Sequence, residues 1–157
     1  MNQSIRSLFA AAILLTAAVQ LHAGGLFITL GNADASAEAG SQHAVLTLKL
    51  TGCGEPAKAV VDASAIGIVE GHRQTIPVRL ISLSEPGAYA VTQQWPDKGR
   101  WVLQFVAKDG SRITSTLVAA GPKSVDRYGA KMAMRAPSEE DLVALLAGAS
   151  AAEVVKK

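Results

Sequence analysis

The sequence predicts an all-β protein, an immunoglobulin-like antiparallel β-sandwich of about seven strands followed by a short C-terminal α-helix. Two observations lead to this fold class. Short segments in which apolar and polar residues alternate recur at a spacing of about 8 to 12 residues, and turn-forming glycine and proline residues separate them. No helical pattern lies between these segments, which favours two packed antiparallel sheets over a parallel sheet with crossover helices.

Alternation with a period of two marks each predicted strand. In the segment 43–51, Leu46, Leu48 and Leu50 alternate with polar residues, so one face of the strand is apolar and the other is polar. The KDGS turn at 108–111 joins the last two strands as a hairpin. The same pattern predicts six further strands, over residues 26–30, 58–69, 74–83, 88–93, 100–107 and 112–119.

Both tryptophans belong to the predicted hairpin SEPGAYAVTQQWPDKGRWVLQF, residues 84–105. Trp101 alternates in phase with Leu103 and Phe105. We therefore expect its large apolar ring to fill the space between the two sheets. Trp95 precedes a proline at the end of a strand, and we expect it at the edge of the sandwich. Its replacement should therefore lower the stability of the fold less than replacement of Trp101.

Ligand contact is the alternative role for this hairpin. Tyr89 and Trp95 would then form a stacking platform for a sugar or a peptide. Only 4% of the residues are aromatic, so the few rings are needed to fill the core. The sequence favours the packing role and leaves Tyr89 and Trp95 as the ligand-contact candidates.

The N-terminus predicts export from the cytoplasm. Arg6 is followed by the apolar run 8–19, which is shorter than the about 20 residues of a membrane-spanning helix. This pattern is typical of a signal peptide over residues 1–23 that is cleaved after Ala23. An uncleaved membrane anchor is the alternative. We expect a periplasmic or extracellular protein without a stable membrane span after cleavage.

The rest of the chain is predicted to form one domain with a helical tail. The sandwich covers residues 24–122, a linker follows over 123–137, and the helix covers 138–157. Ser138 and Asp141 have the spacing of a capping box at its start. Because the leucines of this tail fall on one side, we expect the helix to pack on its own sandwich; docking on a partner is the alternative.

Charge and cysteine content narrow the classes of partner. The chain has 15 Lys and Arg against 13 Asp and Glu, with no basic cluster before the final two lysines. Nucleic acid is therefore not an expected partner, because phosphate neutralisation needs clustered cations. Cys53 is the single cysteine, so an internal disulfide cannot form. We expect its thiol to be partly buried in a turn, since a surface thiol in an oxidising compartment is prone to oxidation or intermolecular pairing.

Catalytic patterns are missing from the sequence. No G-x-S-x-G element is present, and the GCGEP segment around Cys53 offers neither a helix N-terminus nor a cation to activate the thiol. Phosphate-binding glycine loops and paired acid–base carboxylates are also missing. We predict that the protein is not an enzyme and has no cofactor.

Four side chains are candidate metal ligands: His43, His72, Met132 and Met134. Imidazole and thioether groups suit copper. Cys53 is a fifth possible ligand. No sequence spacing joins these residues into one site, so binding would require at least three of the five to converge in the fold. The sequence therefore defines no single set of ligands as a metal site, and copper binding stays an alternative.

The segment PGAYAVTQQWPDKGRWVLQFVA, with the PVRL segment before it, resembles the exported bacterial modules called YtkA-like. These modules share an immunoglobulin-like sandwich with the CopC-type copper-handling proteins, and the resemblance extends over about residues 58–120. It implies the sandwich fold but no activity. The copper-handling relatives carry an N-terminal histidine, whereas the predicted mature chain begins GGLFITL.

Two functions of different class follow. The leading hypothesis is a non-catalytic exported β-sandwich that acts as a binding or interaction module for an unknown protein or envelope component. The alternative is a periplasmic metal-binding protein of the copper-handling type.

Overall fold

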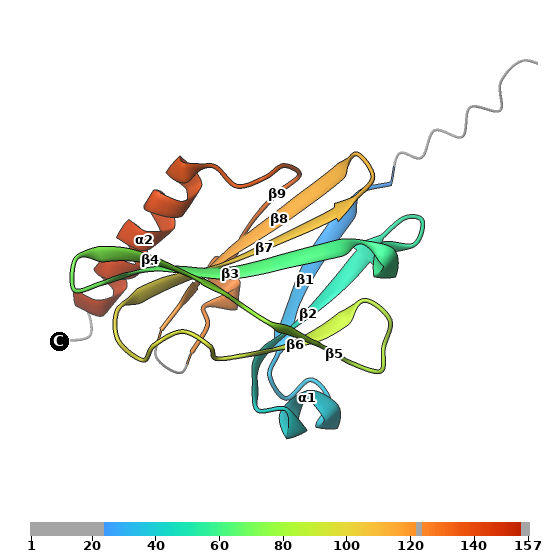
Figure 1. Ribbon diagram of the computed structural model, residues 1–157, viewed down its shortest axis with the longest axis horizontal. Coiled ribbons are helices and arrows are strands. Elements are labelled where there is room, and N and C mark those ends of the chain that lie inside the picture. Colours follow the sequence, from blue (N-terminus) through green and yellow to red (C-terminus); the bar gives the residue numbers. More distant parts are fainter. Residues whose placement is uncertain (1–23, 122–123, 155–157) are drawn as a thin grey trace, which may run out of the picture.

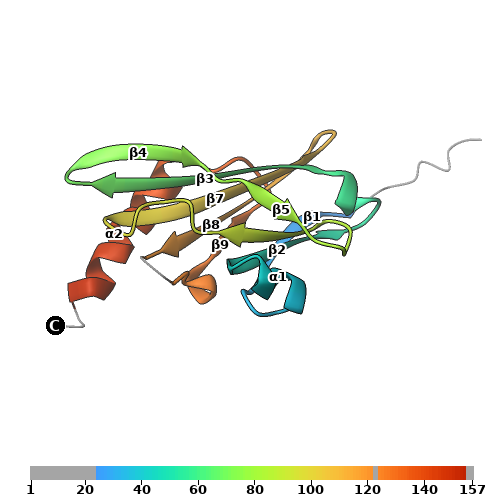
Figure 2. The same cartoon turned by 60° about the horizontal axis from the view of Figure 1, so that its bottom comes forward.

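Nine strands in two facing antiparallel sheets make up the computed structural model, which describes residues 24–121 and 124–154, with side chains as far as Gly148 (Figure 1, Figure 2). The predicted all-β sandwich with a C-terminal helix is confirmed. The predicted signal peptide, residues 1–23, lies outside the described residues. The first sheet contains, in spatial order, β1 (Leu26–Asn32), β2 (Ala44–Gly52), β6 (Ala88–Thr92) and β5 (Leu80–Ser82). The second contains β4 (His72–Pro77), β3 (Val60–Val69), β7 (Arg100–Asp109), β8 (Arg112–Ala120) and β9 (Lys131–Ala133).

The strand order is that of an immunoglobulin domain. β1, β2, β6 and β5 take the places of strands A, B, E and D, and β3, β7 and β8 take those of C, F and G. β4 adds an edge strand beside β3, and β9 adds one beside β8. Short helical segments complete the fold: α1 (Ala37–Ser41), the 3₁₀ turns η1 (Pro56–Lys58) and η2 (Arg127–Gly129), and α2 (Glu139–Val154).

The core between the sheets is built from the apolar faces that the alternation predicts. Leu46, Leu48 and Leu50 of β2 are buried there. Trp101 of β7 is fully buried and donates a hydrogen bond from Nε1 to the carbonyl of Lys98 at 3.0 Å. Its ring covers Gly67, the residue opposite it on β3, so closely that a Cβ there would lie 2.4 Å from the ring. The predicted role of Trp101 as the core residue between the sheets is confirmed.

Trp95 differs from the prediction of a sandwich-edge position. Its side chain is only 4% exposed and belongs to the same core cluster as Trp101. Its Nε1 lies 3.4 Å from the carbonyl of Gly121, which it uses as a hydrogen-bond acceptor. The chain reverses after the end of the strand, and the Trp95 ring points inward. The proline that follows Trp95 therefore indicates a turn, but it does not indicate that the tryptophan is exposed.

The predicted strand 74–83 is two strands in different sheets. β4 ends at Pro77, and the chain then crosses to the first sheet and continues as β5. The side-chain amide of Gln94 holds the crossing segment, because it accepts from the N–H of Arg79 and donates to the carbonyl of Arg79, both at 2.9 Å. Val78 is buried between the two strands and donates its N–H to the carbonyl of Ala63 at 2.9 Å.

The segment 123–137, expected as a linker, also differs from its prediction. It contains η2 and β9, and Ala133 of β9 pairs with Ser115 of β8. The Ser115 hydroxyl donates to the carbonyl of Arg135 at 2.7 Å. These contacts make most of the segment part of the second sheet and its border.

Helix α2 packs on the outer face of the second sheet, as predicted (Figure 1). The predicted capping box is present: the backbone N–H of Ser138 donates to the Asp141 carboxylate at 2.8 Å, and the Asp141 N–H donates to the Ser138 hydroxyl at 3.3 Å. Among the described residues, no helix combines the length and apolar character needed to cross a membrane. The contact between α2 and the second sheet buries Leu142, Leu145 and Leu146 against Ile66, Val102 and Leu117.

Candidate functional site

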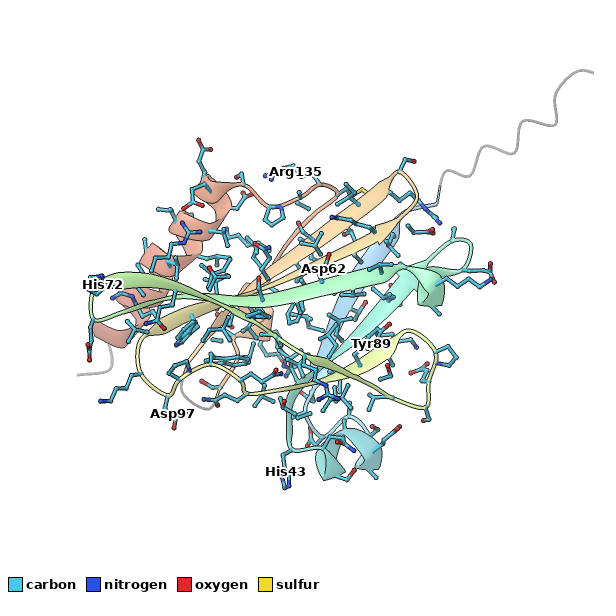
Figure 3. The ribbon with its side chains drawn as sticks, in the orientation of Figure 1. His43, Asp62, His72, Tyr89, Asp97 and Arg135 are labelled. Carbon is cyan, nitrogen blue, oxygen red and sulfur yellow. The ribbon has the colours of Figure 1, made fainter. Side chains whose placement is uncertain are left out.

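The two candidate histidine ligands lie in separate parts of the molecule. His43 is exposed between α1 and β2, and His72 is exposed at the start of β4. Figure 3 shows them on different sides of the sandwich. Within the described part of the chain, no group of three or more His, Cys, Asp and Glu side chains is placed to hold a metal ion. The fold therefore does not bring the imidazoles together.

Met132 and Met134, in contrast, lie close to one another. Met132 is in β9, and Met134 lies two residues later, directly after the end of the strand. They are 68% and 66% exposed. Of the four candidate metal ligands, these two are the ones that are neighbours along the chain.

Tyr89 and Trp95 do not form an exposed stacking platform. Tyr89 of β6 is half-buried and packs against the core, and Trp95 is buried within it. The Trp95 ring, which is buried in the core, cannot stack on a sugar or a peptide from solution. The structure places the Trp95 ring in the core, whereas the ligand-contact role of the half-buried Tyr89 stays a prediction.

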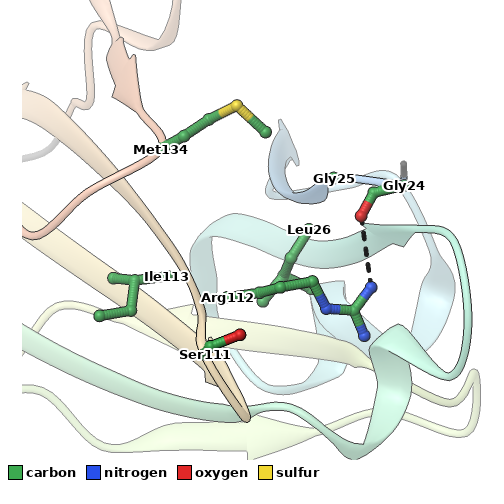
Figure 4. A pocket seen from close by; sticks show the side chains of 7 residues that line it. All are labelled: Gly24, Gly25, Leu26, Ser111, Arg112, Ile113 and Met134. Atoms are coloured by element: carbon green, nitrogen blue, oxygen red, sulfur yellow. Dashed lines mark hydrogen bonds between the residues drawn. The ribbon is translucent and has the colours of Figure 1, made fainter. Parts of the chain in front are cut away.

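A pocket lies where β1 begins, beside the β7–β8 turn (Figure 4). Its volume is about 310 Å³, which is at the lower end of the range for small-molecule sites. Three chain segments come together around it. The lining residues are Gly24, Gly25, Leu26, Ser111, Arg112, Ile113 and Met134.

Arg112 holds these segments together from one side of the pocket. Its Nη1 donates to the carbonyl of Cys53 at 2.9 Å and to that of Gly24 at 3.4 Å. Its Nη2 forms an ion pair with Asp109 in the same hairpin. Both terminal nitrogens therefore have partners within the protein. The guanidinium links the start of β1 and the end of β2 to the β7–β8 turn.

Apolar side chains surround the pocket and stay exposed. Phe27, Ile113 and Met134, which we call the apolar rim, are 44%, 36% and 66% exposed. The ring of Phe27 and the terminal methyl group of Met134 both lie against Gly25, within 2.5 Å and 2.8 Å of the point where a Cβ would stand. Only glycine leaves room for both side chains at this position. The rim can take part in apolar contacts with another molecule.

Cys53 lies next to this region and is exposed, which corrects the expected partial burial. Its backbone carbonyl is held by Arg112 and its N–H donates to the carbonyl of Gly25 at 3.3 Å. The backbone of this turn is thus tied to the start of β1, while the side chain points outward. The turn is therefore held through its backbone, and the Cys53 side chain remains exposed.

Three rim and pocket residues were not singled out from the sequence: Phe27, Arg112 and Ile113. One signal was present for Phe27. In LFITL, it occupies the phase that the alternation assigns to solvent, where threonine follows at position 29. A single exposed apolar residue is common on protein surfaces, so this signal alone does not indicate a contact surface.

The carboxyl groups with clearly shifted pKa values belong to α2 and α1 and not to the rim. Bidentate hydrogen bonds from Arg135 hold the pKa of Asp141 well below its usual range, with help from the Ser138 N–H. A hydrogen bond from Arg73 lowers the pKa of Glu139. The Ser84 N–H and hydroxyl lower the pKa of Glu38. Each shift is explained by a fastening contact between elements of the scaffold.

Comparison with protein-family models, with curated proteins and with solved structures gave no match to this chain. The resemblance to YtkA-like modules stays a prediction from the sequence.

Proposed function

We propose that this protein is a non-catalytic exported β-sandwich that acts as a binding module, and that its contact surface is the apolar rim at the start of β1. One observation carries the proposal. Two exposed apolar side chains, Ile113 and Met134, line one pocket, and a third, Phe27, lies beside it over Gly25. Apolar groups that cluster at a hollow are typical of contact surfaces, whereas isolated exposed apolar residues are not.

Export is part of this proposal and depends on the signal peptide predicted over residues 1–23. Cleavage after Ala23 would make Gly24 the first residue of the mature protein. The chain would then begin at the pocket itself, because Gly24 and Gly25 line it. A partner that binds the rim would meet the new terminus.

Site-specific photo-crosslinking in the producing cell tests the contact surface. A photoactivatable aromatic amino acid replaces Phe27, and the matched control carries it at Thr75, an exposed position on β4. We expect discrete covalent adducts from position 27 and none from position 75. No adducts from position 27, or the same adducts from both positions, would overturn the proposal.

Copper handling stays as a second candidate because Met132 and Met134 are two residues apart and are both exposed. Thioethers are soft ligands that favour copper(I). Titration of the exported protein with copper(I) tests it, with the double substitution of both methionines by leucine as the matched variant. Stoichiometric binding that the double variant loses would support copper handling. A titration without saturable binding would exclude it and leave the rim as a surface for apolar contact.

A further inference from the structure

The four edge strands of the sandwich differ in how they are protected. Exposed sheet edges can pair with other strands, and proteins usually limit this by shortness, charge or proline. β5 and β9 have only three residues each, and β9 includes Lys131. β4 carries Arg73 and ends at Pro77. β1 has seven residues, LFITLGN, with no charge and no proline. It is the unprotected edge among the described strands.

The backbone of β1 leaves a regular set of groups on its free side. The N–H of Cys53 donates to the carbonyl of Gly25, which fixes the phase of the ladder between β1 and β2. In an antiparallel pair this phase repeats every two residues, so Phe27, Thr29 and Gly31 bond to β2. The N–H and C=O groups of Leu26, Ile28 and Leu30 therefore point away from β2. Outside the strand ladders, no backbone hydrogen bond of the described residues involves these three.

The side chains of β1 match this open edge. Leu26 and Ile28 are buried in the core and Leu30 packs against it, while Phe27 and Thr29 face outward. The pocket of about 310 Å³ borders the strand at Leu26, so protein does not fill the space at its start. A strand added here would extend the first sheet and cover part of the rim.

We propose that β1 pairs antiparallel with β1 of a second copy of this chain, so that the two first sheets become one continuous sheet across a twofold axis. This deepens the proposed function, on which it depends, by naming the partner of the rim. With Ile28 opposite Ile28 of the second copy, Leu26 lies opposite Leu30. All the inward-facing side chains then remain on the core side, and the unbonded N–H and C=O groups find each other.

Self-pairing suits this strand for two reasons. The segment LFITL places apolar residues at both ends and at the centre, so its inward face reads the same in either direction. It also carries no charge that its own copy would repel. In this register Phe27 lies opposite Thr29 of the second copy and diagonal to the other Phe27, so the two rings cover the twofold axis together.

Sedimentation analysis over a range of concentrations tests the pairing, with protein purified after export. We expect a concentration-dependent dimer. Thr29→Lys and Thr29→Glu should each raise the dissociation constant at least about tenfold, because like charges meet across the axis. An equimolar mixture of the two variants should restore association. The matched control is Thr75→Lys on β4, which should leave association unchanged. Thr29 faces outward, so these variants keep the core residues of β1.

Amide hydrogen exchange at low and high protein concentration locates the interface. The N–H groups of Leu26, Ile28 and Leu30 should gain protection as the dimer forms, while those of Phe27 and Thr29, already bonded to β2, should change little. A dimer that survives both charge variants and leaves these exchange rates unchanged would place the interface elsewhere and overturn the pairing.

Failure of self-pairing can be distinguished from failure of the proposed function. A protein that stays monomeric up to about 1 mM overturns self-pairing. If position 27 then still crosslinks to a different protein in cells, the binding module stands with another partner. If position 27 also gives no adducts, both proposals fail. Adducts of the chain with itself support both.

Discussion

Apolar side chains on the outer face of the second sheet are covered by a helix, whereas those at the start of β1 are exposed to solvent. On the second sheet, Ile66, Val102 and Leu117 are covered by the leucines of α2. At the start of β1, no described element covers Phe27, Ile113 and Met134. Within the described residues, a helix therefore covers the apolar patch on the second sheet, whereas the rim has no such cover. This difference is the reason to regard the rim as a contact surface and the helix side as structure.

The polar contacts of the two regions reinforce the contrast. Ion pairs fasten α2 at its start, from Arg73 to Glu139 and from Arg135 to Asp141. At the rim, Arg112 binds two backbone carbonyls and Asp109. The ion pairs attach α2 to the sandwich, while the contacts of Arg112 fix the shape of the open pocket.

The largest effect should come from the core on which both regions rest. Trp101→Ala should lower the free energy of unfolding by about 3 to 5 kcal/mol, or prevent folding, because it removes a fully buried ring. Trp95→Ala should have a comparable effect of about 3 kcal/mol, since that ring is buried in the same cluster. Denaturant unfolding of both variants measures this. A small loss for Trp95→Ala would restore the edge position expected from the sequence.

Next in size is the covering contact of α2. Leu146→Ala should lower the free energy of unfolding by about 2 to 3 kcal/mol, because it opens a cavity between the helix and the second sheet. The control on the same helix is Val143→Ala, whose side chain is exposed and whose effect should stay within about 0.5 kcal/mol. Equal effects in denaturant melts would show that α2 is not docked as described.

Close packing around Trp101 gives the third prediction. Gly67→Ala should lower the free energy of unfolding by about 1 to 3 kcal/mol, because the added Cβ would meet the indole ring at 2.4 Å. Gly110→Ala, in the β7–β8 turn with no atom near its would-be Cβ but a φ of 58°, serves as a comparison in which only backbone strain acts. A loss in near-ultraviolet circular dichroism confined to Gly67→Ala would locate the effect at the tryptophan.

These effects also show which parts of the fold the sequence could predict. Alternation and the capping box depend on neighbouring residues, so the core face of β2, the burial of Trp101 and the start of α2 follow from the sequence. The crossing between β4 and β5 does not, because Ile76, Val78 and Leu80 pack into one core from both sheets and keep one phase across the break. Gln94, which holds the crossing, is 15 residues away from Arg79.

The candidate site was less predictable for the same physical reason. Met134 was named from its side-chain chemistry, but its position against Gly25 depends on β9, a three-residue strand without alternation. The pairing of β9 with β8 joins segments that the sequence pattern does not relate. Convergence of Phe27, Ile113 and Met134 is a property of the sheet arrangement, so residue patterns alone could not indicate it.

Acid should weaken the attachment of α2 to the sandwich. Contacts with Arg135 and Arg73 lower the folded-state pKa values of Asp141 and Glu139 below their ordinary values of 3.8 and 4.5. Their contribution to stability is therefore fully present above about pH 4.5 and is lost as the pH falls through the lower folded-state values. Denaturant melts between neutral and acidic pH measure the slope. Asp141→Asn should make it shallower, and an unchanged slope would show that these ion pairs contribute nothing.

The smallest effect on stability should come from the rim itself, where the comparison with α2 is sharpest. Met134→Ala removes a side chain that is 66% exposed, so the free energy of unfolding should change by no more than about 0.5 kcal/mol. If the rim is a contact surface, the same substitution should reduce the yield of photo-crosslinked adducts from position 27, because the methyl group of Met134 and the ring of Phe27 share the space over Gly25. Met132→Ala, equally exposed but outside the pocket lining, should change both measurements less. A large loss of stability with unchanged crosslinking would reverse the assignment and make Met134 part of the scaffold, as Leu146 is on the other side of the molecule.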